Sequence, residues 1–166
     1  MEKRIIDFSL KDEKDQWETI NDKVMGGIST GRMFISENNT AVFQGEVSLK
    51  NYGGFASIRT RPRKFDLNGF QGLEARVFGD GKAYRLRLRT DDDYEGIAYQ
   101  ALFSTTPGEW IVVRLPFDSF TPVFRGQIIR DAPLLNIDAI RRIGFMVADK
   151  QAGPFRLEIE LVKAYS

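Results

Sequence analysis

Arginine occupies every second position of one short run, and this alternation is the chemically most informative pattern in the chain. The run is Tyr84-Arg85-Leu86-Arg87-Leu88-Arg89. In an extended strand successive side chains point to opposite faces, so the three arginines share one face and the apolar residues share the other. Guanidinium groups bind carboxylate and phosphate oxygens through paired hydrogen bonds. The run therefore predicts a strand with one buried face and one face able to bind an anion.

The same alternation in three neighbouring runs extends this face. Residues 55–61, 73–78 and 110–115 each separate an apolar set from a set of arginines and aromatic rings. If these strands share a sheet with residues 84–89, one outer face carries arginines interleaved with rings that stack on a ligand. We predict that this face binds its partner through Phe55, Arg59, Arg76, Arg85, Arg87, Arg89, Trp110 and Arg114. The alternative is that this face is only the solvated side of an antiparallel sheet, whose charged side chains discourage pairing with other chains.

The chain contains many short runs of alternating apolar and polar residues, separated by turn residues. This pattern predicts an all-β chain, whose strands would position this face. Asp80-Gly81, between two such runs, predicts a β-hairpin. Short helices are expected only at residues 12–20 and at residues 137–142, the latter capped by Asn136. Strands are expected at residues 4–8, 33–35, 41–47, 54–60, 72–78, 83–90, 97–103, 109–115, 143–148 and 155–162. About ten strands within residues 1–166 predict a single domain, an antiparallel β-sandwich of the jelly-roll type.

The composition excludes several classes of chemistry. The chain has no His and no Cys, which removes thiol chemistry, His-dependent hydrolases and the usual ligands of zinc, copper and haem. We expect no catalytic residue, no cofactor and no metal site. The acidic run 91–95 lacks the spacing of an EF-hand loop and is interpreted as a solvated loop that pairs with the arginines. An enzyme that uses carboxylates or a lysine is a further alternative.

The charge distribution and the hydropathy of the sequence limit which classes of partner and which cellular location we expect. The formal net charge is +1, yet residues 59–89 carry nine basic and three acidic residues. No RNP, KH or basic-tail motif accompanies this segment, so nucleic acid is not favoured as a partner. No apolar run approaches the roughly 20 residues of a membrane span, and residues 1–7 show no signal-peptide pattern. We expect a cytoplasmic protein, peripheral to a membrane only through a protein partner.

A second compact pattern is Asn21-Asp22-Lys23-Val24-Met25-Gly26-Gly27-Ile28-Ser29, whose adjacent glycines suit neither a helix nor a regular strand. With motifs further along the chain, this loop resembles the complex I intermediate-associated protein 30 family. The signature positions of the loop are Asn21, Asp22, Met25, Gly26, Gly27 and Ser29. Other matching motifs are Trp17 ahead of the loop, Phe43-x-Gly45-x-Val47-Ser48, Asn51-x-Gly53-Gly54-Phe55-Ala56, Gly79-Asp80-Gly81-Lys82-x-Tyr84, Leu115-Pro116-Phe117 and Ile143-Gly144-Phe145.

The resemblance implies a sandwich of the galactose-binding-like type, in agreement with the strands above. It also implies a role like that of mitochondrial relatives, which assist assembly of respiratory complex I, or of chloroplast relatives, which serve photosystem II biogenesis. The family offers no agreed catalytic residues to carry over. We therefore expect a non-enzymatic assembly factor whose partner is a protein, such as a subunit of a membrane redox complex. The alternative is a carbohydrate-binding module in which Phe55, Tyr99 and Trp110 stack on a sugar.

Overall fold

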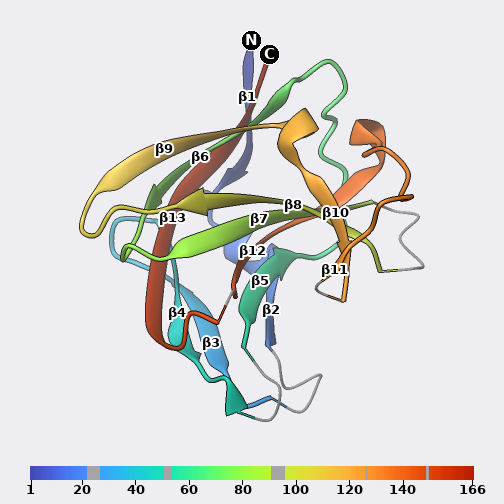
Figure 1. The fold of residues 1–166 in the computed structure, drawn as a ribbon. Coiled ribbons are helices and arrows are strands. Elements are labelled where there is room, and N and C mark those ends of the chain that lie inside the picture. The colour runs from blue at the N-terminus through green and yellow to red at the C-terminus, as the bar shows by residue number, and fades with distance from the viewer. Residues whose placement is uncertain (22–26, 51–53, 91–95, 126, 149) are drawn as a thin grey trace.

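A computed structural model describes residues 1–21, 27–50, 54–90, 96–125, 127–148 and 150–166, and in these residues the regular structure is two antiparallel sheets and three short 3-10 helices. Sheet A contains six strands in the order β3-β4-β13-β6-β9, with β1 also paired to β13 (Figure 1). Its strands are β1 (Glu2–Asp7), β3 (Thr30–Ile35), β4 (Ala41–Val47), β6 (Gly72–Phe78), β9 (Trp110–Pro116) and β13 (Gly153–Tyr165).

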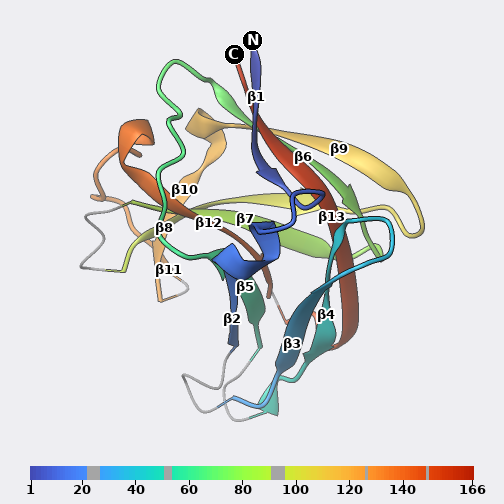
Figure 2. The same cartoon turned by 180° about the vertical axis from the view of Figure 1, so that it is seen from behind.

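Sheet B contains seven strands in the order β11-β10-β8-β7-β12-β5-β2. They are β2 (Trp17–Asn21), β5 (Ala56–Thr60), β7 (Ala83–Thr90), β8 (Ala98–Ser104), β10 (Thr121–Phe124), β11 (Gln127–Ile128) and β12 (Ile140–Val147). The 3-10 helices are η1 (Glu13–Gln16), η4 (Phe117–Ser119) and η5 (Ile137–Ala139). Seen from behind, β1 and β13 bring the two ends of the chain together at the top of the view (Figure 2).

One apolar core lies between the two sheets, and it follows from the alternation along the strands. Tyr84, Leu86 and Leu88 on β7 are fully buried, as are Val77 on β6 and Leu157 on β13. Aromatic rings from strands of sheet B pack together in this core, with Phe145 stacked on Trp17 at 6.4 Å and meeting Phe103 edge-on at 6.2 Å between ring centroids. The predicted all-β antiparallel sandwich is confirmed, and β4, β6 and β7 have the predicted bounds.

The predicted hairpin at Asp80-Gly81 is wrong. This segment joins β6 in sheet A to β7 in sheet B, so it is a crossover between the layers. Asp80 fixes the corner: Oδ1 accepts hydrogen bonds from Lys82 N (3.1 Å) and the Tyr84 hydroxyl (3.0 Å), and Oδ2 accepts one from Arg156 N (2.8 Å). Burial and the nearby Asp80 carboxylate raise the pKa of Tyr84 well above its ordinary value, so its hydroxyl remains a donor.

Strands β2, β10 and β11 and both expected helices differ from the sequence prediction, and the other strands apart from β4, β6 and β7 depart from their predicted bounds by one to three residues at an end. Residues 12–20 hold only the short η1 before the chain enters β2, because Trp17 extends into the core instead of continuing a helical turn. Strands β10 and β11 were not expected, and their pairing positions are few. Of the short helix expected at residues 137–142, only η5 forms, because residues 140–142 already belong to β12. The predicted cap is confirmed, since the Asn136 side chain accepts from Asp138 N at 3.2 Å.

Replacement of Asp80 by alanine is expected to lower the free energy of unfolding by about 2–3 kcal/mol, since three hydrogen bonds to a charged acceptor are lost. Urea denaturation at neutral pH measures the change. Tyr84→Phe, which removes only one of the three bonds, is the control and is expected to cost about 1 kcal/mol. An Asp80→Ala variant no less stable than Tyr84→Phe would refute this account of the crossover.

Candidate functional site

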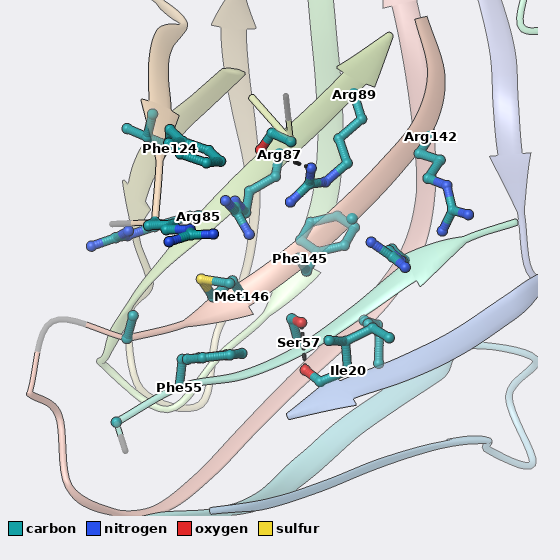
Figure 3. Close-up of a pocket in the computed structure, with 18 of the residues that line it drawn as sticks. Ile20, Phe55, Ser57, Arg85, Arg87, Arg89, Phe124, Arg142, Phe145 and Met146 are labelled. Atoms are coloured by element: carbon teal, nitrogen blue, oxygen red, sulfur yellow. Dashed lines mark hydrogen bonds between the residues drawn. The ribbon is translucent and has the colours of Figure 1, made fainter. Parts of the chain in front are cut away.

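The outer face of sheet B is hollowed into a groove of about 520 Å³. Figure 3 shows Arg85, Arg87 and Arg89 reaching from β7 into one space, with Phe55 and Phe124 on either side of Arg85. We call this space the arginine groove. Among the described residues that line it none is acidic, and the cationic ones are Arg59, Arg85, Arg87, Arg89, Arg125, Arg142 and Lys150.

Strand register explains how the arginines converge. Gly144 on β12 is paired with Arg87 of β7 on one side and with Arg59 of β5 on the other. Paired strands lie about 4.8 Å apart, so these two arginines start roughly 10 Å from each other with no side chain between them. A Cβ at position 144 would come within 2.6 Å of the Ile58 carbonyl oxygen. Glycine at this position therefore both permits the pairing with β5 and leaves the floor of the groove open.

Four of the arginines have identified partners at the edges of the groove. Glu18 on β2 accepts hydrogen bonds from Arg59 Nε at 3.0 Å and from Arg142 at 2.9 Å. Burial raises the pKa of Glu18, but these two bonds outweigh it, so the pKa lies below its ordinary value and the carboxylate stays ionised. Arg85 donates to Gln100 Oε1 at 3.2 Å, and Arg89 donates to the Gly96 carbonyl at 3.0 Å.

Arg87 is different, because it makes no hydrogen bond or ion pair with any described residue. Its Nε is buried and lacks a hydrogen-bond partner. Burial, followed by repulsion from Arg89, Arg85 and Arg59, lowers the pKa of Arg87 to about 10. The guanidinium is still charged at neutral pH, so the groove holds a partly desolvated cation that an entering anion would neutralise.

Apolar side chains form the walls beside these cations. Ile20, Leu49 and Met146 line the groove together with the rings of Phe55 and Phe124, and the Arg125 guanidinium lies 5.1 Å from the centroid of the Phe124 ring. The groove therefore offers positive charge at its floor and apolar contact at its walls. Such an arrangement suits a ligand with both anionic and apolar groups.

The prediction of one continuous arginine and aromatic face is wrong. Strands β6 and β9 belong to sheet A, so Arg76, Phe78, Trp110 and Arg114 lie on the other layer. There the Arg76 guanidinium is 4.6 Å from the Trp110 ring centroid and pairs with Glu160. Arg114 is paired with Glu74 at 3.2 Å. Local alternation identified the outward residues correctly, but not the sheet to which each strand belongs.

Of the predicted site, the structure brings together Phe55, Arg59, Arg85, Arg87 and Arg89 in the arginine groove. Tyr99, predicted as a sugar platform, is instead 95% buried on the inner face of β8, where its hydroxyl donates to the Pro133 carbonyl at 2.7 Å. A buried ring held in this way does not stack on an external sugar.

The signature loop does not line the groove within its described part. Asn21 is paired with the buried Ala56, on the opposite face of β2 from Ile20, and Gly27 is buried. Ser29 is fully buried, donates to the Ser48 carbonyl at 3.1 Å and accepts from Ser48 N at 2.9 Å. These contacts join β3 to β4 and are structural. Asp22, Met25 and Gly26, and the acidic run 91–95, lie outside the described residues.

Several residues of the groove were missed at the level of sequence. Arg142, Gly144 and Met146 come from β12, which is inserted between β5 and β7 although it lies far from both in the chain. Their spacing by two is a signal that they share a face, but nothing local indicates which sheet receives them. Phe124, Arg125 and Lys150 come from turns and from the short strand β10.

Comparison with protein families gives a match to the model described as complex I intermediate-associated protein 30, over residues 6–159. The chain belongs to this family. It is 29% identical over 96% of its length to the mouse mitochondrial protein of that name, and 28% identical over 95% to the Drosophila melanogaster one. It spans only 55% and 61% of those two relatives. Both relatives are named as complex I intermediate-associated proteins of mitochondria.

Among solved structures, the fold is similar to that of a family 11 carbohydrate-binding module from Clostridium thermocellum, in complex with a β-1,3-1,4-mixed-linked tetrasaccharide. The TM-score is 0.72 at 16% identity, over 99% of this chain and 95% of that one. At 16% identity this similarity shows that the two chains share the sandwich fold, and nothing further. Within the described residues no helix is long and apolar enough to cross a membrane, and no cluster of Asp and Glu is placed to hold a metal ion.

Arg87→Met is expected to raise the free energy of unfolding by about 1–2 kcal/mol, because it removes a desolvated charge and keeps the apolar volume of the side chain. Urea denaturation at pH 7 measures this. Arg76→Met on sheet A is the matched control, and loss of its exposed ion pair is expected to leave stability unchanged or lower it by up to about 1 kcal/mol. A destabilised Arg87→Met variant would show that the guanidinium is already satisfied.

Proposed function

We propose that this chain is a non-enzymatic binding module that assists the assembly of a membrane redox complex, and that it holds its protein partner in the arginine groove. The observation that carries the proposal is Arg87, a charged side chain with a buried, unpartnered Nε at the floor of a groove that has apolar walls. Such a cation costs desolvation free energy in the unbound chain, and a partner that neutralises it offsets that cost.

The family supports the assembly part of the proposal. The mouse and fly relatives are named as complex I intermediate-associated proteins, and the chain matches about half of each. The lack of His and Cys, and of any acidic residue among the described groove lining, supports binding over acid–base catalysis. The expected partner is a subunit or assembly intermediate of a membrane complex that presents acidic groups.

A carbohydrate-binding function is the second candidate, favoured by the similarity to the family 11 module, whose structure contains a bound tetrasaccharide. Its predicted stacking residues weaken it in this chain. Trp110 lies on sheet A and Tyr99 is buried, which leaves Phe55 as the one member of that set beside the groove.

The test is capture of partners from detergent-solubilised membranes of the source organism by the tagged chain, quantified by mass spectrometry. We expect subunits of one redox complex to be enriched, and Arg85→Glu/Arg87→Glu to reduce their capture at least about tenfold, since reversal of a central charge removes a complementary contact. Arg87→Met, which keeps the fold and loses the charge, is expected to reduce capture in the same direction.

The matched control is Arg76→Glu/Arg114→Glu, the same charge reversal on sheet A, which is expected to capture as well as wild type. All variants are first checked by thermal melting. Equal capture by the groove variant and the wild type would refute the role of the groove, and equal loss in both double variants would point to charge alone. Failure to enrich any membrane complex, together with binding of a neutral β-glucan, would favour the carbohydrate module.

A further inference from the structure

Arg87 leaves a vacant, directional hydrogen-bonding edge in the centre of the groove. Its Nε is buried without a partner, and its two terminal nitrogens, which keep contact with solvent, donate to no described residue. The two terminal nitrogens of a guanidinium form a planar fork that matches the two oxygens of a carboxylate. Gly144, paired with Arg87 on β12, adds no side chain beside it.

The surroundings of this fork favour a ligand with more than one anionic group. Arg85 and Arg89 flank Arg87 on the same strand, and Arg59 lies across Gly144. Among the described residues, Glu18 pairs with Arg59 and Arg142 at the end of the groove beside β2. Arg87 takes no part in these ion pairs and is repelled by Arg89, Arg85 and Arg59.

The walls combine four aliphatic side chains with the two rings of Phe55 and Phe124, the aliphatic ones being Ile20, Leu49, Val123 and Met146. Aliphatic walls fit the side chains of a peptide, whereas sugar rings bind to aromatic platforms, so the aliphatic majority favours an acidic peptide. The lining runs across sheet B from Ile20 on β2 to Val123 on β10. Five strand spacings of about 4.8 Å make a path of roughly 24 Å, which an extended peptide of about seven residues covers.

We infer that the arginine groove binds an extended acidic protein segment of about seven residues, in which a Glu or Asp carboxylate docks on the Arg87 fork and alternating apolar side chains pack on the aliphatic walls. This inference rests on the proposed function, because it specifies the chemistry of the partner at the same site. The carboxylates of the segment neutralise Arg87 and its neighbours, and the apolar groups add contact area along the path.

Isothermal titration calorimetry with the purified chain tests this directly. The probe is a synthetic, capped peptide of about seven residues in which Glu and Leu alternate, and its comparison is the same peptide with Gln at every Glu position. We expect the acidic peptide to bind at least about tenfold more tightly than the neutral one, and to weaken as salt is raised from about 50 to 500 mM.

Three variants assign the binding to Arg87. Arg87→Met is expected to lose at least about tenfold in affinity for the acidic peptide, and Arg87→Lys, which keeps the charge but not the fork, an intermediate amount. Arg76→Met on sheet A is expected to bind as the wild type does. If Arg87→Lys binds as well as wild type, the forked contact is refuted, and if Arg87→Met does, so is the site.

Other anions and sugars complete the experiment. Inorganic phosphate, an oligogalacturonate and a mixed-linked β-glucan tetrasaccharide are titrated under the same conditions. Tighter binding of the oligogalacturonate or of the neutral glucan than of the acidic peptide would overturn the inference in favour of a glycan, and binding of phosphate alone would overturn it in favour of a small anion. Peptide binding without capture of a membrane complex would refute the assembly role while leaving the peptide site intact, and capture without peptide binding would do the reverse.

Discussion

Burial of one face of β7 holds the arginines of its other face together. Tyr84, Leu86 and Leu88 are fully buried between the two sheets. Burial of each such side chain stabilises a fold by about 1.5–3 kcal/mol. Repulsion between guanidinium groups that still touch solvent is weakened by a high effective dielectric constant and by salt. The free energy gained by burying the apolar face is larger than this repulsion, so packing in the core fixes the position of β7. The three arginines of β7 therefore lie together on one surface.

The hydrogen-bond partners of the other arginines make the end of the groove beside β2 different from its centre. Glu18 fixes Arg59 and Arg142 at the β2 side, whereas the centre has Gly144, which adds neither charge nor volume. Gln100 and the Gly96 carbonyl accept hydrogen bonds from Arg85 and Arg89. Arg87, between them on β7, keeps a buried Nε without a partner, so the least compensated of the described cations lies at the centre of the groove.

Local alternation along the chain was sufficient to predict most of the strands, the sandwich and the outward direction of Arg59, Arg85, Arg87 and Arg89. It was not sufficient to predict the assembly of the sheets. Strand β12 enters between β5 and β7, and β13 between β4 and β6, through pairings of large sequence separation that no local pattern encodes. The Asp80 turn looked like a hairpin because glycine at a positive φ suits both a hairpin and a crossover. As a result, the sequence prediction combined the outer faces of the two sheets into a single face. It placed Trp110 and Arg76 of sheet A beside the arginines of sheet B.

The same alternation explains how one sandwich carries different binding chemistries. The family 11 module shares the fold of this chain at 16% identity, because inner positions need apolar volume while outer positions are chosen independently. In this chain the outer position 87 holds a cation whose Nε is buried and unpartnered. The core does not require that charge, since an apolar side chain would serve the outer face of β7 with less desolvation cost. We propose that an anion entering the groove offsets this cost, and for this reason we assign the proposed binding function to sheet B and not to the paired arginines of sheet A.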